Sequence, residues 1–323
     1  MFAKTTLTGI AVLALGASVH SASAQNFPVK PIRFVVPLAA GGPGDVLARA
    51  IGQKLSERVG QPVVIDNRPG ANTNVGSEFV AKAPPDGYTL LVTASTLTIN
   101  PSLYPTLPYD PVRDFAPITL IALTPLILVV HPSLPVKSVT ELIALARSKP
   151  GQLNYGSAGN GSALHLAGEM FNSLARVKLV HVPYKGVTGA FSDLLGGQIS
   201  IMFPGAPIAL PQVRAGKLRA LGTTGAGRTS AAPELPPISE AGLPGYEVSV
   251  WYGILAPAGT PTAVINRLHA EISKIVQLPE IKERWAVLGA EPLYNTPEQF
   301  AAFLKADLGK WAKVVRDSGA KID

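Results

Sequence analysis

The sequence predicts an α/β fold in which two doubly wound lobes are joined by two crossovers. Three observations lead to this prediction: short apolar strands alternate with amphipathic helical segments, the alternation forms two separate series, and two long apolar strands connect the series. Such alternation is typical of α/β proteins with parallel sheets. The 323 − 24 = 299 residues that follow position 24 are also more than a single hydrophobic core usually covers.

The first series starts with the strand IRFVV, a glycine-rich turn and a helix. The helix repeats apolar residues at every fourth position from Leu47 to Val59 and is expected to end near Gly60. The strand PVVI, a short helix over residues 76–83 and the strand YTLLVT complete a β-α-β-α-β half.

A long apolar stretch, PITLIALTPLILVVHP, leads to a helix that opens with a capping box at Ser138. The second series contains the strand LNYGS, a helix from Ser162, the strand KLVHV, a helix over 187–195, and the strands ISIMF and LRALGTT. The strand VSVWYGILAP follows. Two Thr-Pro pairs, at 260–261 and 296–297, predict helices with proline at the first position, which return the chain to the first lobe.

We therefore expect one lobe over residues 25–126 and 248–323, and a second lobe over 127–247. Two lobes joined by two crossovers can hinge. A ligand is expected in the cleft between them, because loops from both lobes meet there at the carboxyl ends of the strands.

Residues 1–24 have the pattern of a signal peptide cleaved near Ala24, which predicts export to the periplasm. Lys4 precedes an apolar run, and small residues follow it. An uncleaved anchor is the alternative, but the run is shorter than the ~20 residues that span a bilayer. The sequence contains no cysteine, which excludes disulfides, thiol nucleophiles and thiolate metal sites.

The formal net charge is +7, but only 15% of the residues are charged. No dense basic stripe is present, so a nucleic-acid partner is not expected. A mild positive field helps to collect small anions, and it equally serves solubility.

The glycine-rich turn GGPGD, which starts at Gly41, matches neither a Walker loop nor the dinucleotide fingerprint. Glycines at a helix start expose peptide N–H groups that attract a carboxylate as well as a phosphate. Asp45 is expected to cap the helix with its own oxygen. A tight connection without a ligand would use the same residues.

The stretch NYGSAGNGSALHLAGEMF repeats this arrangement, with Ser162 as the expected helix cap. Two such turns, one in each lobe, can hold a carboxylate from both sides. Ser95 and Thr96 follow the third strand and add hydroxyl donors.

Enzymatic readings find little support. In YGSAG, Tyr155 replaces the first glycine of the nucleophile elbow, so the motif does not support Ser157 as a nucleophile. His165 and Glu169 are one helical turn apart and could share a metal, although such a pair is more often on a solvated face. His131 and His181 are interpreted as structural. We therefore expect no catalytic residue, metal or cofactor.

Six motifs in order resemble the Bug/TctC family of extracytoplasmic solute receptors. They are PVKPIRFVVPLAAGGPGDVLAR, NRPGANTNVGSEFVAKAPPDGYTLL, NYGSAGNGSALHLAGEMF, VPYKG, DLLGGQIS and RAGKLRAL. The resemblance implies a type II periplasmic binding protein that closes on a small carboxylate. It also implies delivery of that ligand to the membrane subunits of a tripartite tricarboxylate transporter, and we expect a monomer.

The resemblance also implies a set of ligand contacts drawn from the turns of both lobes and from VPYKG. They are Ala39, Ala40, Gly41, Gly42, Ser95, Thr96, Ser157, Gly159, Gly161, Ser162, His165, Tyr184 and Lys185. Lys185 has the alternative of being a simple surface lysine.

One departure from the family concerns specificity. Many relatives carry aspartate after IMF, whereas this chain has Pro204, which offers no side-chain acceptor for an amino group. We therefore expect a ligand without an ammonium group, such as a dicarboxylate or an aromatic acid.

Two alternatives to a transport receptor remain for the function of the protein. They are a sensory receptor that docks on a membrane kinase and a secreted hydrolase.

Overall fold

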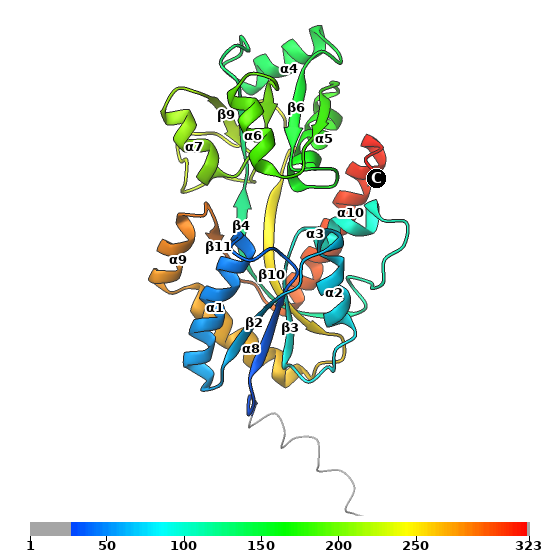
Figure 1. The fold of residues 1–323 in the computed structure, drawn as a ribbon, viewed down its shortest axis with the longest axis vertical. Coiled ribbons are helices and arrows are strands. Elements are labelled where there is room, and N and C mark those ends of the chain that lie inside the picture. The colour runs from blue at the N-terminus through cyan, green and yellow to red at the C-terminus, as the bar shows by residue number, and fades with distance from the viewer. Residues whose placement is uncertain (1–26, 322–323) are drawn as a thin grey trace, which may run out of the picture.

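The computed structural model describes residues 27–321, which form two lobes, each built around one sheet (Figure 1). The predicted signal peptide, residues 1–24, lies outside the described residues. Within 27–321, none of the helices is both long and apolar enough to cross a membrane.

The sheet of the first lobe has six strands in the order β11-β4-β10-β3-β1-β2. Its strands are β1 (Ile32–Val36), β2 (Val63–Asn67), β3 (Thr89–Ala94), β4 (Phe115–Pro125), β10 (Ser249–Pro257) and β11 (Glu291–Pro292). The helical segments around it are α1 (Pro43–Val59), η1 (Ala71–Thr73), α2 (Asn74–Ala81), α3 (Thr96–Leu103), α8 (Thr262–Val276) and α9 (Pro279–Ala286).

The sheet of the second lobe has five strands in the order β7-β6-β8-β5-β9. Its strands are β5 (Ile127–Val130), β6 (Asn154–Ser157), β7 (Val180–Pro183), β8 (Ile201–Met202) and β9 (Arg219–Thr223). Its helices are α4 (Val139–Ser148), α5 (Ala163–Ala175), α6 (Val187–Leu195) and α7 (Ala206–Arg214), and the last helix of the chain is α10 (Pro297–Ser318).

Both sheets are mixed, so the expectation of parallel sheets is only partly correct. The βα series give parallel pairs, β1 with β2 and β3, and β6 with β7 and β8. The crossover strands run the other way: β10 is antiparallel to β3 and β4, and β5 is antiparallel to β8 and β9. The reason is that a strand that returns directly from the other lobe enters the sheet from the opposite end.

The strands of the first lobe are apolar on both faces because helices cover both. Phe34 belongs to the same buried cluster as Leu47 of α1, whereas its neighbour Val35 belongs to a cluster with Val80 of α2. Successive side chains of a strand point to opposite faces, so this alternation places α1 and α2 on opposite sides of the sheet.

The helix starts agree with the sequence patterns in part, since the capping box at Ser138 is half formed: the Glu141 carboxylate accepts the Lys137 N–H rather than that of Ser138. Ser138 accepts a hydrogen bond from the Glu141 N–H at 3.1 Å, and Thr296 forms a complete capping box. Pro261 is the cap residue of α8 rather than its first helical residue, because its ψ of 135° is extended.

The carboxyl ends of the central strands in both lobes point toward the other lobe. After β4, the chain continues into β5 and away from the first sheet (Figure 1). Because β8 is antiparallel to β5 and β6 is parallel to β8, β6 runs back toward the first lobe. The loops after β1, β3 and β6 therefore lie on the facing sides of the two lobes.

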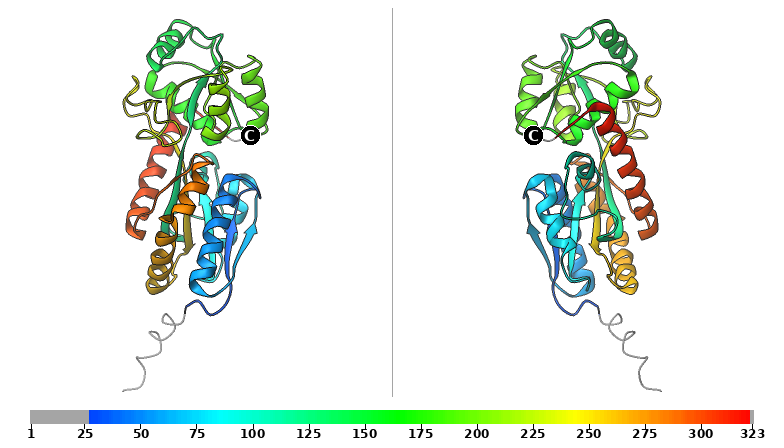
Figure 2. Two further views of the ribbon diagram at one scale, coloured as in Figure 1. Left: turned by 90° about the vertical axis from the view of Figure 1, so that its left-hand side faces the viewer. Right: turned by 90° about the vertical axis from the view of Figure 1, so that its right-hand side faces the viewer.

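The final helix does not belong to the first lobe alone. Phe300 and Leu304 join a cluster of the first lobe, whereas Trp311, Val314 and Val315 join the core of the second lobe. Figure 2 shows α10, in red, beside both lobes. The expectation that the C-terminal helices return to the first lobe is therefore wrong for the second half of α10.

Candidate functional site

In the first lobe, the predicted glycine-rich turn leads from the end of β1 directly into α1. Gly42 is the cap residue of α1, so no side chain caps this helix start, and Pro43 is the first helical residue. Gly41 has a φ of +78°, a conformation that glycine adopts without strain. The local sequence therefore forms the turn that its glycines predict.

Asp45 does not cap α1 as expected. It is 2% exposed and accepts hydrogen bonds from the Gly41 N–H and from Arg49 Nε, both at 2.9 Å, and from Asn67 Nδ2 at 3.0 Å. Its carboxylate reaches back past Gly42 because Asp45 is already the third residue of the helix. Burial raises the pKa of Asp45, but these hydrogen bonds outweigh it and lower the pKa.

The predicted contacts of this turn divide into two kinds. The N–H groups of Gly41 and Gly42 bond within the turn, to Asp45 and to the Ala39 carbonyl. Within residues 27–321, the N–H groups of the exposed Ala39 and Ala40 have no hydrogen-bond partner. These two amides are therefore donors that an anion can use.

Ser95 and Thr96 lie at the same edge of the sheet, because β3 is parallel to β1. Ser95 precedes α3, is 2% exposed, and makes no side-chain cap hydrogen bond to that helix. The Thr96 hydroxyl accepts a hydrogen bond from Thr73 Oγ1 at 2.9 Å. Ser95 thus adds a third donor at this end of the sheet for a ligand that reaches between the lobes.

The segment that contains Thr73 lies in one of the six family motifs but supplies none of the expected ligand contacts. Three consecutive residues, Ala71, Asn72 and Thr73, have φ of +45°, +51° and +79°. Asn100 holds them by donating to the Asn72 carbonyl at 2.7 Å. Such strain persists only where the surroundings enforce it, often at functional sites, and the asparagines of GANTN were its sequence signal.

In the second lobe, β6 ends at Ser157 and a turn with two left-handed glycines leads into α5. Gly159 and Gly161 have φ of +124° and +74°. The Ser162 hydroxyl accepts a hydrogen bond from the His165 N–H, which confirms the predicted helix cap.

Most of the predicted contacts in this turn bond to one another. Ser157 Oγ is fully buried, bonds to Gly159 and lies 2.6 Å from His181 Nε2. The Gly161 N–H donates to His165 Nδ1 at 3.1 Å. In the described chain, the amides of Ala163 and Leu164, at the start of α5, have no partner. These are the donors that the second lobe presents.

Two imidazoles stack behind this turn. The rings of His165 and His181 lie 3.8 Å apart at 14° to each other. Burial and the adjacent His181 lower the pKa of His165 to about 3, and burial lowers that of His181 to about 4. Both rings are therefore neutral near pH 7 and contribute no positive charge to the site.

The pair of His165 and Glu169 is not on a solvated face, contrary to the commoner expectation for such spacing. Both side chains are largely buried, at 6% and 14% exposure, and their polar atoms are 3.9 Å apart. Burial raises the pKa of Glu169, which accepts a hydrogen bond from the Tyr155 hydroxyl. Across residues 27–321, no group of three potential ligands among His, Cys, Asp and Glu surrounds a metal position.

Tyr184 and Lys185 follow β7, next to the same turn. The Tyr184 N–H donates to the Ser157 carbonyl at 3.2 Å, and its hydroxyl donates to Asp193 at 2.7 Å. Burial and the hydrogen bond to Asp193 raise the pKa of Tyr184 to about 12. Lys185 is exposed and makes no ion pair with the described residues. Tyr184 thus braces the turn, and Lys185 remains a free cation beside it.

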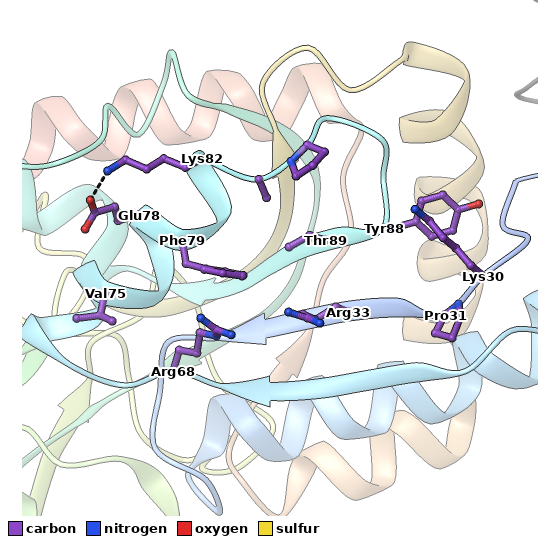
Figure 3. Close-up of a pocket in the computed structure, with 12 residues that line it drawn as sticks. Lys30, Pro31, Arg33, Arg68, Val75, Glu78, Phe79, Lys82, Tyr88 and Thr89 are labelled. Atoms are coloured by element: carbon purple, nitrogen blue, oxygen red, sulfur yellow. Dashed lines mark hydrogen bonds and ion pairs between the residues drawn. The ribbon is translucent and has the colours of Figure 1, made fainter.

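A cavity of about 730 Å³ lies elsewhere on the first lobe, between α2 and strands β1 and β3 (Figure 3). Its lining contains none of the predicted ligand contacts. Its cations are matched by carboxylates: Lys30 pairs with Asp86, Lys82 with Glu78, and Arg33 and Arg68 with Asp66. Each of the four cations has a carboxylate partner, although Arg33 and Arg68 share Asp66, so the lining holds no unpaired cation that would favour an anion there.

Comparison with known proteins identifies several relatives. The family model described as "Tripartite tricarboxylate transporter family receptor" (TctC) matches residues 47–320. The chain is 36% identical over 302 residues to Protein BugT from Bordetella pertussis, and the alignment covers 93% of both chains.

Two solved structures are similar over nearly the whole chain. "R. palustris Rpa4515 with adipate" is 38% identical with a TM-score of 0.78, and MatC from Rhodopseudomonas palustris with bound malate is 33% identical with a TM-score of 0.74. These alignments cover 92% and 90% of this chain, respectively, and 100% of each solved chain.

Proposed function

We propose that this chain, which belongs to the TctC family of tripartite tricarboxylate transporter receptors, captures a small carboxylate between its two lobes in the periplasm. The observation that carries the proposal is the pair of turns on the facing sides of the lobes. Each follows a strand, opens a helix and leaves amides unbonded, at Ala39 and Ala40 and at Ala163 and Leu164. Amides at helix starts favour an anion without the need for an arginine.

The proposed contacts are the thirteen residues expected from the sequence, together with Ala163 and Leu164, whose amides the structure leaves unbonded. Ala39, Ala40 and Ser95 supply donors in the first lobe, and the amides of Ala163 and Leu164, directly after the cap residue Ser162, supply the opposing ones. The remaining glycines, Ser157 and His165 shape the turns. Hydrogen bonds to a charged group contribute about 1.5–3 kcal/mol each, so four or five support about micromolar affinity after association costs.

We propose a ligand without an ammonium group. Pro204 is buried between β8 and α7, and its carbonyl accepts the Ile127 N–H at 2.8 Å, so this position offers no side-chain acceptor. The relatives with adipate and with malate support a dicarboxylate, because neither acid has an amino group. Tighter binding of aspartate or glutamate than of any non-amino acid would contradict this proposal.

We further propose that the ligand-bound form delivers its ligand to the membrane subunits of a tripartite tricarboxylate transporter. The ligand favours the closed form only by as much as it binds that form more tightly. A sensory role would use the same closure with a different membrane partner. Uptake of the identified ligand by cells that carry the transporter separates the two roles.

A hydrolase has one observation in its favour, the contact between Ser157 Oγ and His181 Nε2 at 2.6 Å. Ser157 is fully buried, however, and its oxygen also bonds to Gly159, so an incoming carbonyl group does not reach it. We therefore propose binding without chemistry. A binding protein releases its ligand unchanged on denaturation, whereas a hydrolase releases product.

The test is a thermal-shift screen over mono-, di-, tri- and aromatic carboxylates. A true ligand at one hundred times its dissociation constant stabilises the protein by about 2.7 kcal/mol. Gly42→Leu should abolish this stabilisation: its φ of −75° suits any residue, but the added Cβ lies 3.2 Å from the Ala39 carbonyl oxygen, so the side chain crowds the turn that presents the Ala39 and Ala40 amides. Gly309→Leu is the matched control, since Gly309 is exposed on α10 with open space around it. Stabilisation that survives Gly42→Leu would place the site elsewhere.

A further inference from the structure

A buried carboxylate lies at the middle of α10. Asp307 is 4% exposed, and its Oδ2 accepts hydrogen bonds from Thr98 Oγ1 at 2.7 Å, Trp251 Nε1 at 2.8 Å and Trp311 Nε1 at 3.1 Å. Lys310 Nζ pairs with Oδ1 at 2.9 Å. The charge is therefore satisfied on both oxygens, as a buried ion requires.

The donors come from three different elements. Thr98 belongs to α3, Trp251 to the crossover strand β10 and Trp311 to α10 itself. Asp307 also stands where α10 passes from one core to the other, between Leu304 in a cluster of the first lobe and Trp311 in the core of the second. A single carboxylate thus joins the crossover strand β10 to α3 and α10, and each of these two helices has residues in the buried clusters of both lobes.

Thr98 connects this carboxylate to the proposed ligand site. Its hydroxyl lies 2.9 Å from the Ser95 carbonyl as well as 2.7 Å from Asp307, and the Ser95 carbonyl also accepts the N–H groups of Thr98 and Ile99. These bonds define the first turn of α3, which starts directly after Ser95. The Ser95 hydroxyl is one of the proposed donors of the first lobe.

We infer that Asp307 is a positioning residue for the carboxylate site: through Thr98 it fixes the first turn of α3, and with it Ser95, relative to α10 and to the crossover strand β10. The inference rests on the proposed function, since the affinity concerned is that for the carboxylate. An apolar residue at 307 could pack equally well, but only an acceptor holds three donors in one arrangement.

The first test compares Thr98→Val with Thr98→Ser. Valine keeps the shape and removes the donor, and serine keeps the donor. With the tightest carboxylate from the screen, isothermal titration should show affinity about tenfold weaker for Thr98→Val and within about twofold of wild type for Thr98→Ser. If Thr98→Val folds and binds the carboxylate with wild-type affinity, the inference is overturned. A hydrogen bond with only a structural role would lower the melting temperature and leave the affinity unchanged.

A second pair of variants covers the case in which Thr98→Val does not fold. Trp311→Phe removes another donor from Asp307, and Trp285→Phe is the control, because the buried Trp285 indole N–H has no acceptor in the described chain. We expect weaker binding for Trp311→Phe only. Equal affinities for the two variants would contradict the role of Asp307.

Hydrogen exchange on the unliganded protein separates this inference from the proposed function. The amides of Thr98 and Ile99 should exchange faster in Thr98→Val and Trp311→Phe than in wild type and Trp285→Phe. If no carboxylate binds the wild type, the proposed function fails. Unchanged exchange at these amides overturns the inference whether or not a ligand is found.

Discussion

At the scale of single residues, the stacked His165 and His181 link the second-lobe turn to pH. Both rings are neutral in the folded protein, with pKa values of about 3 and 4, whereas an unfolded histidine titrates near 6.5. Between pH 6.5 and about 4, the unfolded chain therefore binds more protons than the folded one. The free energy of unfolding consequently falls as the pH falls through this range.

We predict a loss of about 1.4 kcal/mol per pH unit for each of the two imidazoles between pH 6 and pH 5. Urea denaturation of the unliganded protein at pH 5, 6 and 7 measures this slope. His181→Phe keeps an aromatic ring against His165 and removes one titrating group. The slope of its free energy of unfolding against pH should therefore be smaller by about 1.4 kcal/mol per pH unit, which corresponds to one proton. An unchanged slope in this variant would show that His181 is already protonated in the folded state.

The sequence could predict the turn but not this histidine pair. Gly159, Gly161 and Ser162 follow local rules for left-handed residues and helix caps, which neighbouring residues largely determine. His165 and His181 meet only because β7 pairs with β6 and places His181 beside Tyr155. Sequence reasoning therefore took His165 from family resemblance and gave His181 only a structural role.

At the scale of elements, the sequence patterns predicted the strongly periodic helices but not α3, α7 or α9. The segment that forms α3 contains Pro101 and several β-branched residues, and the segment that forms α7 contains Pro207 and Pro211. These residues disfavour helices locally. Burial of Leu97 and Ile99 in α3, and of Ala209 and Leu210 in α7, stabilises both helices through tertiary packing.

The start of α5 offers a test of the proposed amide donors. Ala163→Asp places a negative charge at the first helical residue, where it should favour the helix by about 0.3–1 kcal/mol. The same charge should repel a bound carboxylate and weaken its affinity. Ala163→Asn is the uncharged control of equal size.

Thermal unfolding without ligand and titration with ligand measure the two effects. We expect Ala163→Asp to be at least as stable as wild type and to bind the ligand at least about tenfold more weakly than Ala163→Asn, a difference of about 1.4 kcal/mol. Equal affinities for the two variants would mean that the ligand does not approach the start of α5.

At the scale of the whole molecule, the two proposed hinge points meet at one residue. The sequence places the lobe boundaries after residue 126 and before residue 248. Thr224 is fully buried and forms hydrogen bonds to Leu126 and Val248, the residues at these two boundaries, with both its backbone and its side chain. Its N–H donates to the Leu126 carbonyl at 2.9 Å, and its carbonyl accepts the Val248 N–H at 2.8 Å.

The sequence could predict the crossovers because two long apolar runs interrupt the βα series. It could not predict Thr224, since nothing in LRALGTT distinguishes one threonine from the next. The Thr224 hydroxyl accepts the Leu126 N–H at 2.7 Å and donates to the Val248 carbonyl at 2.6 Å, whereas the buried Thr223 hydroxyl finds no partner in the described chain. Only the three-dimensional arrangement separates their roles.

This difference gives a prediction for the hinge. Thr224→Val should leave a buried N–H and a buried carbonyl without their side-chain partner and lower the free energy of unfolding by about 2 kcal/mol or more. Thr223→Val should have little effect or stabilise the protein, because it removes an unpaired buried hydroxyl. Chemical denaturation measures both. If the crossovers form the hinge, small-angle scattering of the unliganded protein should show a changed radius of gyration for Thr224→Val and an unchanged one for Thr223→Val. Identical stability and radius of gyration in the two variants would contradict a role of Thr224 in the hinge.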